Sequence, residues 1–135
     1  MTDIFRIANA SVLPFWAMMI IAPRSRLTRS VMTSRVVYVA LGSLYVALLA
    51  VGMSRADRDK FRDFMREPSP ERLADMMSDP AVMTAGWVHY LAFDLYVGRA
   101  IWQESVDADR PARLPLVLTM LAGPSGLLLH IVRRT

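Results

Sequence analysis

Four long apolar runs separated by charged segments form the main pattern of this chain. The runs cover residues 4–22, 36–53, 81–103 and 114–132, and the second contains no charged residue. A helix needs about 20 residues to cross the hydrocarbon core of a bilayer, so each run has a suitable length. The charged residues gather in the loops and at the ends, as is typical of membrane proteins. The pattern predicts one domain with an all-α fold, an integral membrane four-helix bundle.

The charged segment between the second and third runs contains signals for short helices. Phe61 and Phe64 recur at helical spacing among charged residues, which predicts a short amphipathic helix at the membrane interface. Ser69-Pro70 and Asp79-Pro80 each combine a good N-cap residue with proline at the first helical position. We therefore expect a helix to begin at each of these two pairs.

Two prolines inside the apolar runs predict local distortions of the helices. Pro14 frees the carbonyl of Ala10 from its helical hydrogen bond and should bend the first span. Pro124 lies within a Gly-Pro-Ser-Gly sequence and should interrupt the fourth span. Residues 23–35, between the first two runs, are predicted to form a short basic loop.

The third run carries ionisable residues at membrane depth. Burying such a residue costs from ~3 to more than ~10 kcal/mol, and these residues usually face the bundle interior or a wet cavity. His89, Asp94 and Arg99 are therefore the candidate catalytic residues. The alternative is a structural polar core, in which the same three groups only specify how the helices pack.

Other residues share helix faces with these groups or lie near the prolines, and they are candidate ligand contacts. Trp87, Tyr90, Asp94 and Gly98, for example, lie on one face because they are spaced i, i+3, i+7 and i+11. The complete set of candidate ligand-binding residues is Asn9, Trp16, Trp87, Tyr90, Gly98, Gly123, Pro124, Gly126 and His130. The pair Tyr38 and Tyr45, seven residues apart, is equally consistent with packing and with ligand contact.

Composition excludes several kinds of chemistry. The chain has no cysteine, which excludes disulfides, thiolate catalysis and Cys-ligated metals. Ionisable metal ligands within the runs are few and include no Glu-x-x-His repeat, so no metal site is predicted. The net charge of +4 comes from basic residues that flank the apolar runs. That placement favours contact with anionic lipid headgroups and not with nucleic acid. Proton transfer is the chemistry that remains.

Three sequence blocks carry a resemblance to a known family. They are Leu13-Pro14-Phe15-Trp16 with Pro23-Arg24, the stretch 86–99 that contains Trp87, His89, Asp94 and Arg99, and the stretch 123–129 that begins Gly-Pro-Ser-Gly. These blocks resemble the membrane-protein family founded on the plant abscisic-acid-deficient-four protein, which is implicated in neoxanthin formation. The resemblance implies a small four-helix integral membrane protein linked to carotenoids.

The resemblance also implies a function. The expected activity is a neoxanthin-synthase-like isomerisation of a carotenoid or related isoprenoid by acid and base groups, without net oxidation. His89 or protonated Asp94 would donate a proton, the other group would accept one, and Arg99 would hold the carboxylate or a substrate oxygen. The alternative is a non-catalytic carotenoid-binding or accessory subunit of a membrane complex, and a proton-coupled transporter is a weaker third reading.

The expected surroundings follow from the same reasoning. We expect membrane lipid and a carotenoid or other isoprenoid as partners, with a homo-oligomer or a membrane complex as further possibilities, and no cofactor beyond a carotenoid as substrate or bound pigment. A bacterial inner membrane or a photosynthetic membrane is the expected location. The distribution of basic residues favours both termini in the cytoplasm.

Overall fold

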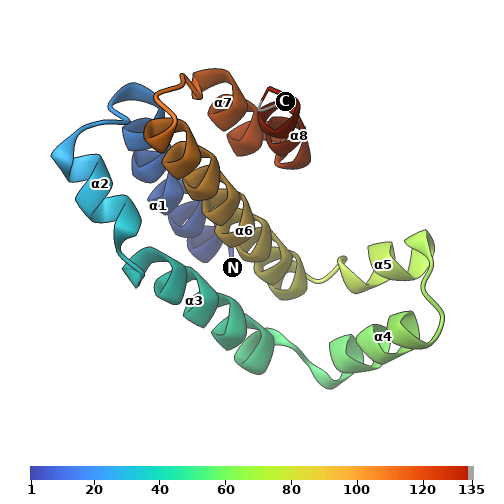
Figure 1. Ribbon diagram of the computed structural model, residues 1–135. Coiled ribbons are helices and arrows are strands. Elements are labelled where there is room, and N and C mark those ends of the chain that lie inside the picture. Colours follow the sequence, from blue (N-terminus) through green and yellow to red (C-terminus); the bar gives the residue numbers. More distant parts are fainter. Residues whose placement is uncertain (134–135) are drawn as a thin grey trace.

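The computed structural model describes residues 1–133, without the side chains of Val51, Gly52 and Arg55. In that part of the chain all the regular structure is helical, which confirms the all-α fold class. Figure 1 shows the arrangement. The helices are α1 (Thr2–Ile21), α2 (Arg26–Thr33), α3 (Val36–Gly52), α4 (Arg55–Arg66), α5 (Pro70–Met76), α6 (Pro80–Asp107), α7 (Arg113–Ala122) and α8 (Pro124–Val132).

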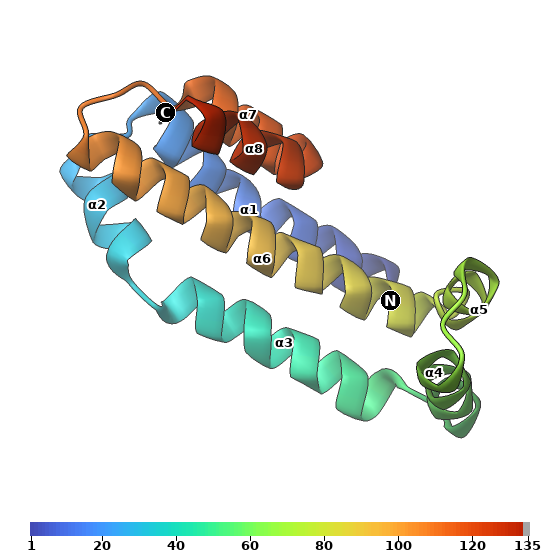
Figure 2. The ribbon, with the colours of Figure 1, turned by 45° about the vertical axis from the view of Figure 1, so that its right-hand side comes forward.

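Helix α6 is the centre of the fold. It packs against α1, α3, α7 and α8, and Figure 2 shows α1 and α3 running along it. The largest core side chains come from these helices and include Trp16 of α1, Leu95 and Trp102 of α6 and Leu116 of α7, each at most 3% exposed. The core side chains of α1, α6 and α7 therefore meet along α6.

Local capping explains where several helices begin, as predicted. The Asp79 carboxylate accepts hydrogen bonds from the backbone N–H groups of Ala81 and Val82 at the start of α6. The Ser69 hydroxyl accepts from the N–H of Arg72 at the start of α5. Each cap satisfies donors that the first helical turn leaves without a partner.

One predicted segment in the first half of the chain is corrected. Residues 23–35 were expected to form a loop but contain α2, where Ser25 caps the N–H of Thr28 and Met32 is fully buried. With only 8 residues and many polar side chains, this helix was missed, although Leu27 and Val31 recur at helical spacing. Helix α1 is continuous from Thr2 to Ile21 with Pro14 inside it, and the bend expected at this proline stays a prediction.

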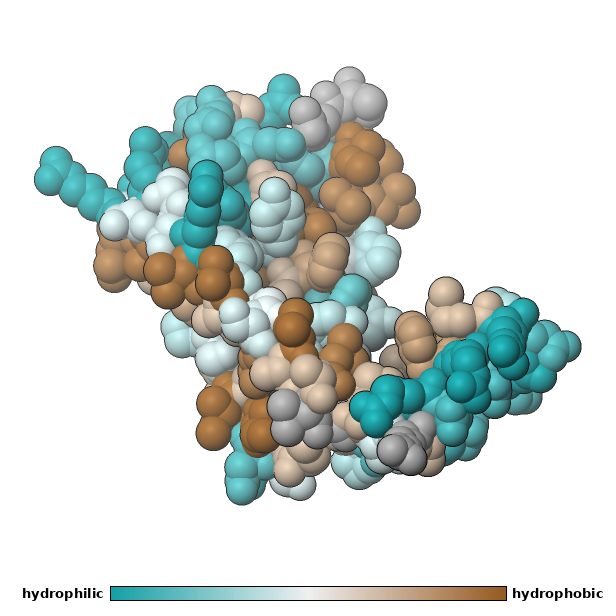
Figure 3. All heavy atoms as spheres, turned by 90° about the horizontal axis from the view of Figure 1, so that it is seen from below, coloured by the Kyte–Doolittle hydropathy of each residue, from teal (hydrophilic) through white to brown (hydrophobic). Residues whose placement is uncertain are grey.

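The predicted amphipathic helix around Phe61 and Phe64 is α4, and the helix predicted to begin at Ser69-Pro70 is α5. The two helices pack against each other. Ser54 and Asp57 form a capping box at the start of α4. Figure 3 shows hydrophilic side chains gathered over α4 and α5. Their apolar side, including Phe61 and Phe64, lines a pocket shared with α3 and α6.

The fourth apolar run differs most from its prediction. It is interrupted as expected, but at Gly123 the chain reverses, and α7 and α8 form a helical hairpin rather than one kinked span (Figure 2). With 10 and 9 residues, each arm is about 15 Å long, half the ~30 Å thickness of the hydrocarbon core. The start of α1 and the end of α8 consequently lie at opposite ends of the bundle (Figure 2). This placement does not support both termini on one side of a membrane.

The four-span bundle is not confirmed. By length and composition, one described helix, α1, could cross a membrane, or two spans are present if α2 and α3, bent by 40°, count as one. The 28 residues of α6 are long enough, but its ionisable residues lower its apolar character. Large apolar side chains are nevertheless exposed on the bundle, among them Ile7 at 69% and Phe93 at 60%.

Candidate functional site

One exposed face of α6 carries a row of aromatic rings that ends at a carboxylate. His89, Phe93, Tyr96, Ala100 and Glu104 are spaced four, three, four and four residues apart, so they share a face, and all five are exposed. We call this face the α6 track. Between its first and last residues the helix advances about 22 Å. The track is therefore a long exposed surface that carries three aromatic rings.

Contacts between aromatic rings fix the positions of the aromatic side chains of the α6 track. The rings of His89 and Phe93 stack with their centroids 4.5 Å apart. Helix α3 lines one side, because Tyr45 lies 5.6 Å from His89 and Tyr38 lies 5.7 Å from Tyr96. Such aromatic pairs contribute more stability than the surface area that they bury would provide. They therefore help to hold α3 against α6.

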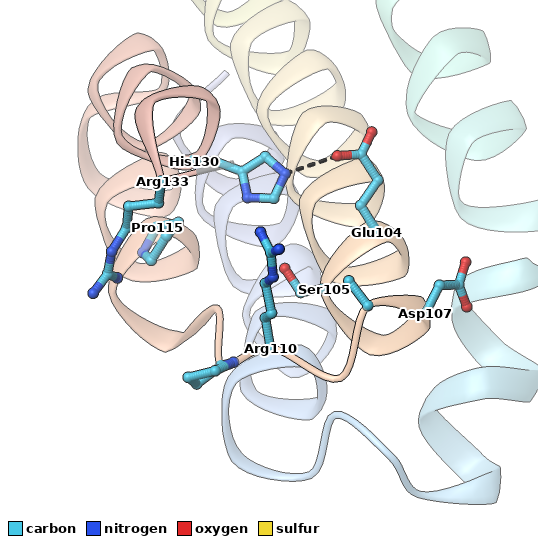
Figure 4. Close-up of a pocket in the computed structure, with 9 residues that line it drawn as sticks. Glu104, Ser105, Asp107, Arg110, Pro115, His130 and Arg133 are labelled. Carbon is cyan, nitrogen blue, oxygen red and sulfur yellow. Dashed lines mark hydrogen bonds and ion pairs between the residues drawn. The ribbon is translucent and has the colours of Figure 1, made fainter. Parts of the chain in front are cut away.

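The far end of the track carries a carboxylate–imidazole pair. Glu104 Oε2 lies 2.8 Å from Nε2 of His130 in α8. His130 is only 8% exposed, and the pair opens onto a hollow of about 700 Å³. Figure 4 shows the guanidinium of Arg110 lying toward the His130 ring and the hydroxyl of Ser105. An acid–base pair and a nearby cation thus meet at the end of an aromatic surface.

The three predicted catalytic residues are not brought together. His89 contacts the rings of Tyr45 and Phe93, whereas Asp94 faces the hairpin. Arg99 lies over the ring of Tyr38, with its guanidinium carbon 5.5 Å from the ring centroid. His89 and Arg99 therefore lie against two different tyrosines of α3 and Asp94 lies at the hairpin turn, and the joint catalytic role of the three stays a prediction.

Asp94 packs against the turn between α7 and α8. A methyl group added at Gly123 would lie 2.5 Å from Asp94 Oδ1, so the glycine leaves the space that the carboxylate occupies. The half-buried side chain points into the fold, as predicted. It lies at the turn and does not pair with His89 or Arg99 in the described structure.

Several predicted ligand contacts are packing contacts between α1 and α6. The ring of Trp16 covers Gly98, where an added methyl group would lie 2.4 Å from Cη2 of the tryptophan. Trp87 Nε1 donates a hydrogen bond to Asn9 Oδ1 at 3.3 Å. Tyr90 is exposed beside His89, with the two ring centroids 6.0 Å apart.

The remaining candidates belong to the hairpin. Gly123 and Pro124 form the turn, with the proline at the first position of α8. Gly126 lies against the α7 backbone, where an added methyl group would be 2.3 Å from the N atom of Thr119 and 2.4 Å from the O atom of Pro115. Of the predicted ligand contacts, His130 is the one that enters the polar pair.

Glu104 and Arg110 are functional candidates that the sequence prediction missed. Both follow the apolar run that ends at residue 103. Helix α6 continues past this run to Asp107 and so includes Glu104, whereas Arg110 lies in the loop before α7. Helical periodicity offered a signal, because Glu104 falls on the same face as His89. In the described residues no group of three or more His, Asp or Glu side chains could hold a metal ion.

Comparison with known proteins places the chain in a family. The family model described as ABA DEFICIENT 4-like matches residues 3–130. Protein ABA DEFICIENT 4, chloroplastic, from Arabidopsis thaliana is 28% identical over 134 residues, which cover 98% of this chain and 61% of that protein. The chain thus spans about three fifths of the length of this relative. No solved structure matches. Because the family model covers nearly the whole sequence, the chain belongs to the ABA DEFICIENT 4-like family.

Proposed function

We propose that this chain is a membrane-embedded protein that binds a carotenoid or related isoprenoid along the α6 track and isomerises its oxygenated end at Glu104 and His130. The observation that carries the proposal is the continuity of one helix face from aromatic rings to a carboxylate–imidazole pair. Membership of the ABA DEFICIENT 4-like family supports it, since the sequence blocks that carry the resemblance imply a link to carotenoids.

The exposed apolar surface supports a membrane location. Soluble monomers rarely expose large contiguous apolar patches, whereas Figure 3 shows hydrophobic side chains open to the surface of the bundle. In the proposed arrangement α1, α2 with α3, and α6 cross the bilayer, and the hairpin of α7 and α8 enters it and returns. A photosynthetic membrane or a bacterial inner membrane would provide the carotenoid.

The exposures of the two partners suggest how the pair would act. The side chain of Glu104 is 45% exposed and that of His130 only 10%, so the carboxylate faces the ligand and the imidazole lies behind it. Glu104 accepts a proton from one ligand atom, and the pair returns a proton to another atom of the same ligand. The ligand's bonds shift while its atoms and electrons are conserved, so no oxidant is required. Arg110 stabilises negative charge that develops on the ligand oxygen.

A non-catalytic carotenoid-binding or accessory subunit is the second candidate function. The observation in its favour is that His89, Asp94 and Arg99 do not meet, because His89 and Arg99 lie against separate tyrosines of α3 and Asp94 lies at the hairpin turn. In this case the aromatic surface would bind pigment and the polar residues would serve packing or assembly, with a second copy or another membrane protein as partner.

Pigment chromatography separates the two functions. The chain, its Glu104→Gln variant and its Asp94→Asn variant are each expressed in a carotenoid-producing host, and extracted and copurified pigments are compared. We expect a new isomer with the unaltered chain and ~100-fold less of it with Glu104→Gln, the usual scale for losing a general acid or base. If the new isomer is lost with Asp94→Asn but not with Glu104→Gln, the reaction takes place at the hairpin turn instead. Unchanged pigments that copurify would support the binding subunit, and the absence of both results would contradict the proposal.

A further inference from the structure

Tyr38 carries a buried polar atom without a partner. Its hydroxyl is the one buried side-chain polar atom in the described part of the chain that makes no hydrogen bond. Buried polar groups are nearly always hydrogen-bonded, and an exception costs stability. A phenylalanine would fill the same space without that cost. The hydroxyl therefore requires an explanation other than packing.

A second hydrogen-bond donor lies over the ring of Tyr38. The Arg99 guanidinium is placed over the Tyr38 ring, and no acidic side chain of the described residues pairs with it. Tyr96, a residue of the α6 track, meets the Tyr38 ring edge-on. Two donors without an acceptor thus lie at the edge of the track, between α3 and α6.

We propose that Tyr38 and Arg99 form a binding site for an oxygen atom on the end ring of a carotenoid. Both groups donate hydrogen bonds, so they select a ligand atom that accepts them, such as a hydroxyl or epoxide oxygen. Arg99 has a long flexible side chain, and its rotation away from the Tyr38 ring admits that oxygen. The site rests on the proposed function for the path of the ligand along the α6 track.

The position of this site explains what it would contribute. Arg99 precedes Glu104 by five residues, about 7.5 Å along the helix axis. An oxygen held at Tyr38 and Arg99 would place the neighbouring part of the ring near the Glu104 carboxylate. Oxygenated carotenoids would therefore be preferred over hydrocarbon carotenoids, and they would be held in one register on the track.

Binding of two pigments to the protein purified in detergent tests this site. β-Carotene and zeaxanthin share a carbon skeleton and differ by two ring hydroxyls. We expect the unaltered chain to bind zeaxanthin about five- to tenfold more tightly, the effect of one hydrogen bond. Tyr38→Phe and Arg99→Met each remove a hydrogen-bond donor, so each should abolish this preference while the affinity for β-carotene is retained. The ligand-free melting temperature of Tyr38→Phe should not fall, because the hydroxyl has no partner to lose.

The outcomes separate this inference from the proposed function. A Tyr38→Phe protein that still prefers zeaxanthin would overturn the oxygen site and leave carotenoid binding intact. A lower melting temperature of the ligand-free variant would overturn it too, because the hydroxyl would then serve folding. If the unaltered chain binds neither pigment, the proposed function itself fails.

Discussion

Single residues determine how closely α1 approaches α6. Gly98 faces the ring of Trp16, and a methyl group there would overlap the ring at 2.4 Å. Because Trp16 is buried among core side chains, the ring cannot move aside without disturbing its neighbours. The glycine is therefore a packing requirement at this crossing.

The corresponding prediction concerns Gly98→Ala. Overpacking a dense core costs about 1–3 kcal/mol, so the variant should unfold at lower temperature or denaturant concentration than the unaltered chain in the same detergent. Gly42→Ala is the matched control, because no atom lies within 4 Å of its added methyl group and alanine is the better helix former. Equal stability of the two variants would contradict the close contact with Trp16.

At the level of elements, the hairpin of α7 and α8 positions half of the proposed acid–base pair. Gly126 faces the backbone of α7, including the N atom of Thr119 and the O atom of Pro115. Backbone atoms cannot rotate away as a side chain can, so any larger residue must separate the two helices. Their separation would also move His130 away from Glu104.

Gly126→Ala should therefore lose both stability and the function of the pair. We expect a destabilisation of at least ~1–3 kcal/mol, the cost of an overpacked contact, measured by thermal unfolding in detergent. The pigment conversion should fall with it. Ser125→Ala, at the exposed neighbouring position, is the control and should change neither measurement. An unaltered melting temperature for Gly126→Ala would argue against the hairpin.

The start of α4 offers a prediction on pH dependence. Hydrogen bonds from the Ser54 side chain and backbone N–H lower the pKa of Asp57. A carboxyl group with a lowered folded-state pKa stabilises the fold above its unfolded value of ~4, and this contribution is lost as the pH falls through the folded-state pKa. Ser54→Ala should thus melt a few degrees lower at neutral pH. The difference should shrink below pH ~4. A difference that is constant with pH would show that Asp57 does not contribute through its charge.

At the scale of the whole molecule, the hairpin decides the topology. An element that enters the membrane and returns leaves the start of α1 and the end of α8 on opposite sides of a bilayer, as the two ends of the bundle suggest (Figure 2). A fourth crossing would place them on the same side. The number of crossings can thus be measured from the two ends of the chain.

Single cysteines test this topology directly, because the chain contains none of its own. In oriented vesicles we expect Thr2→Cys and Arg133→Cys to react with a membrane-impermeant reagent from opposite sides. Asp75→Cys on α5 is the control and should react from the side of Thr2, since Figure 2 places α5 and the N-terminal end of α1 at one end of the bundle. Labelling of Thr2→Cys and Arg133→Cys from one side would restore the four-span bundle. Release of the protein by an alkaline or high-salt wash would contradict embedding altogether.

The sequence alone predicted the features that depend on interactions between neighbouring residues. The N-caps at Ser69 and Asp79 and the break before Pro124 act within one helical turn, so their sequence pattern is sufficient. Four apolar runs predicted most of the helical regions, and three sequence blocks were enough to identify the family. The end of α6 was missed because the run of hydrophobic residues ends at residue 103, whereas the helix ends at Asp107.

The tertiary structure alone decided which residues meet. Helical periodicity places His89 and Asp94 on different sides of α6, but it does not say that one would meet α3 and the other the turn at Gly123. The pairing of Glu104 with His130 depends on the reversal of the chain at that turn. Whether a proline bends or reverses a helix is set by what the second arm packs against. That contact joins residues far apart in the chain, so no local pattern contains it.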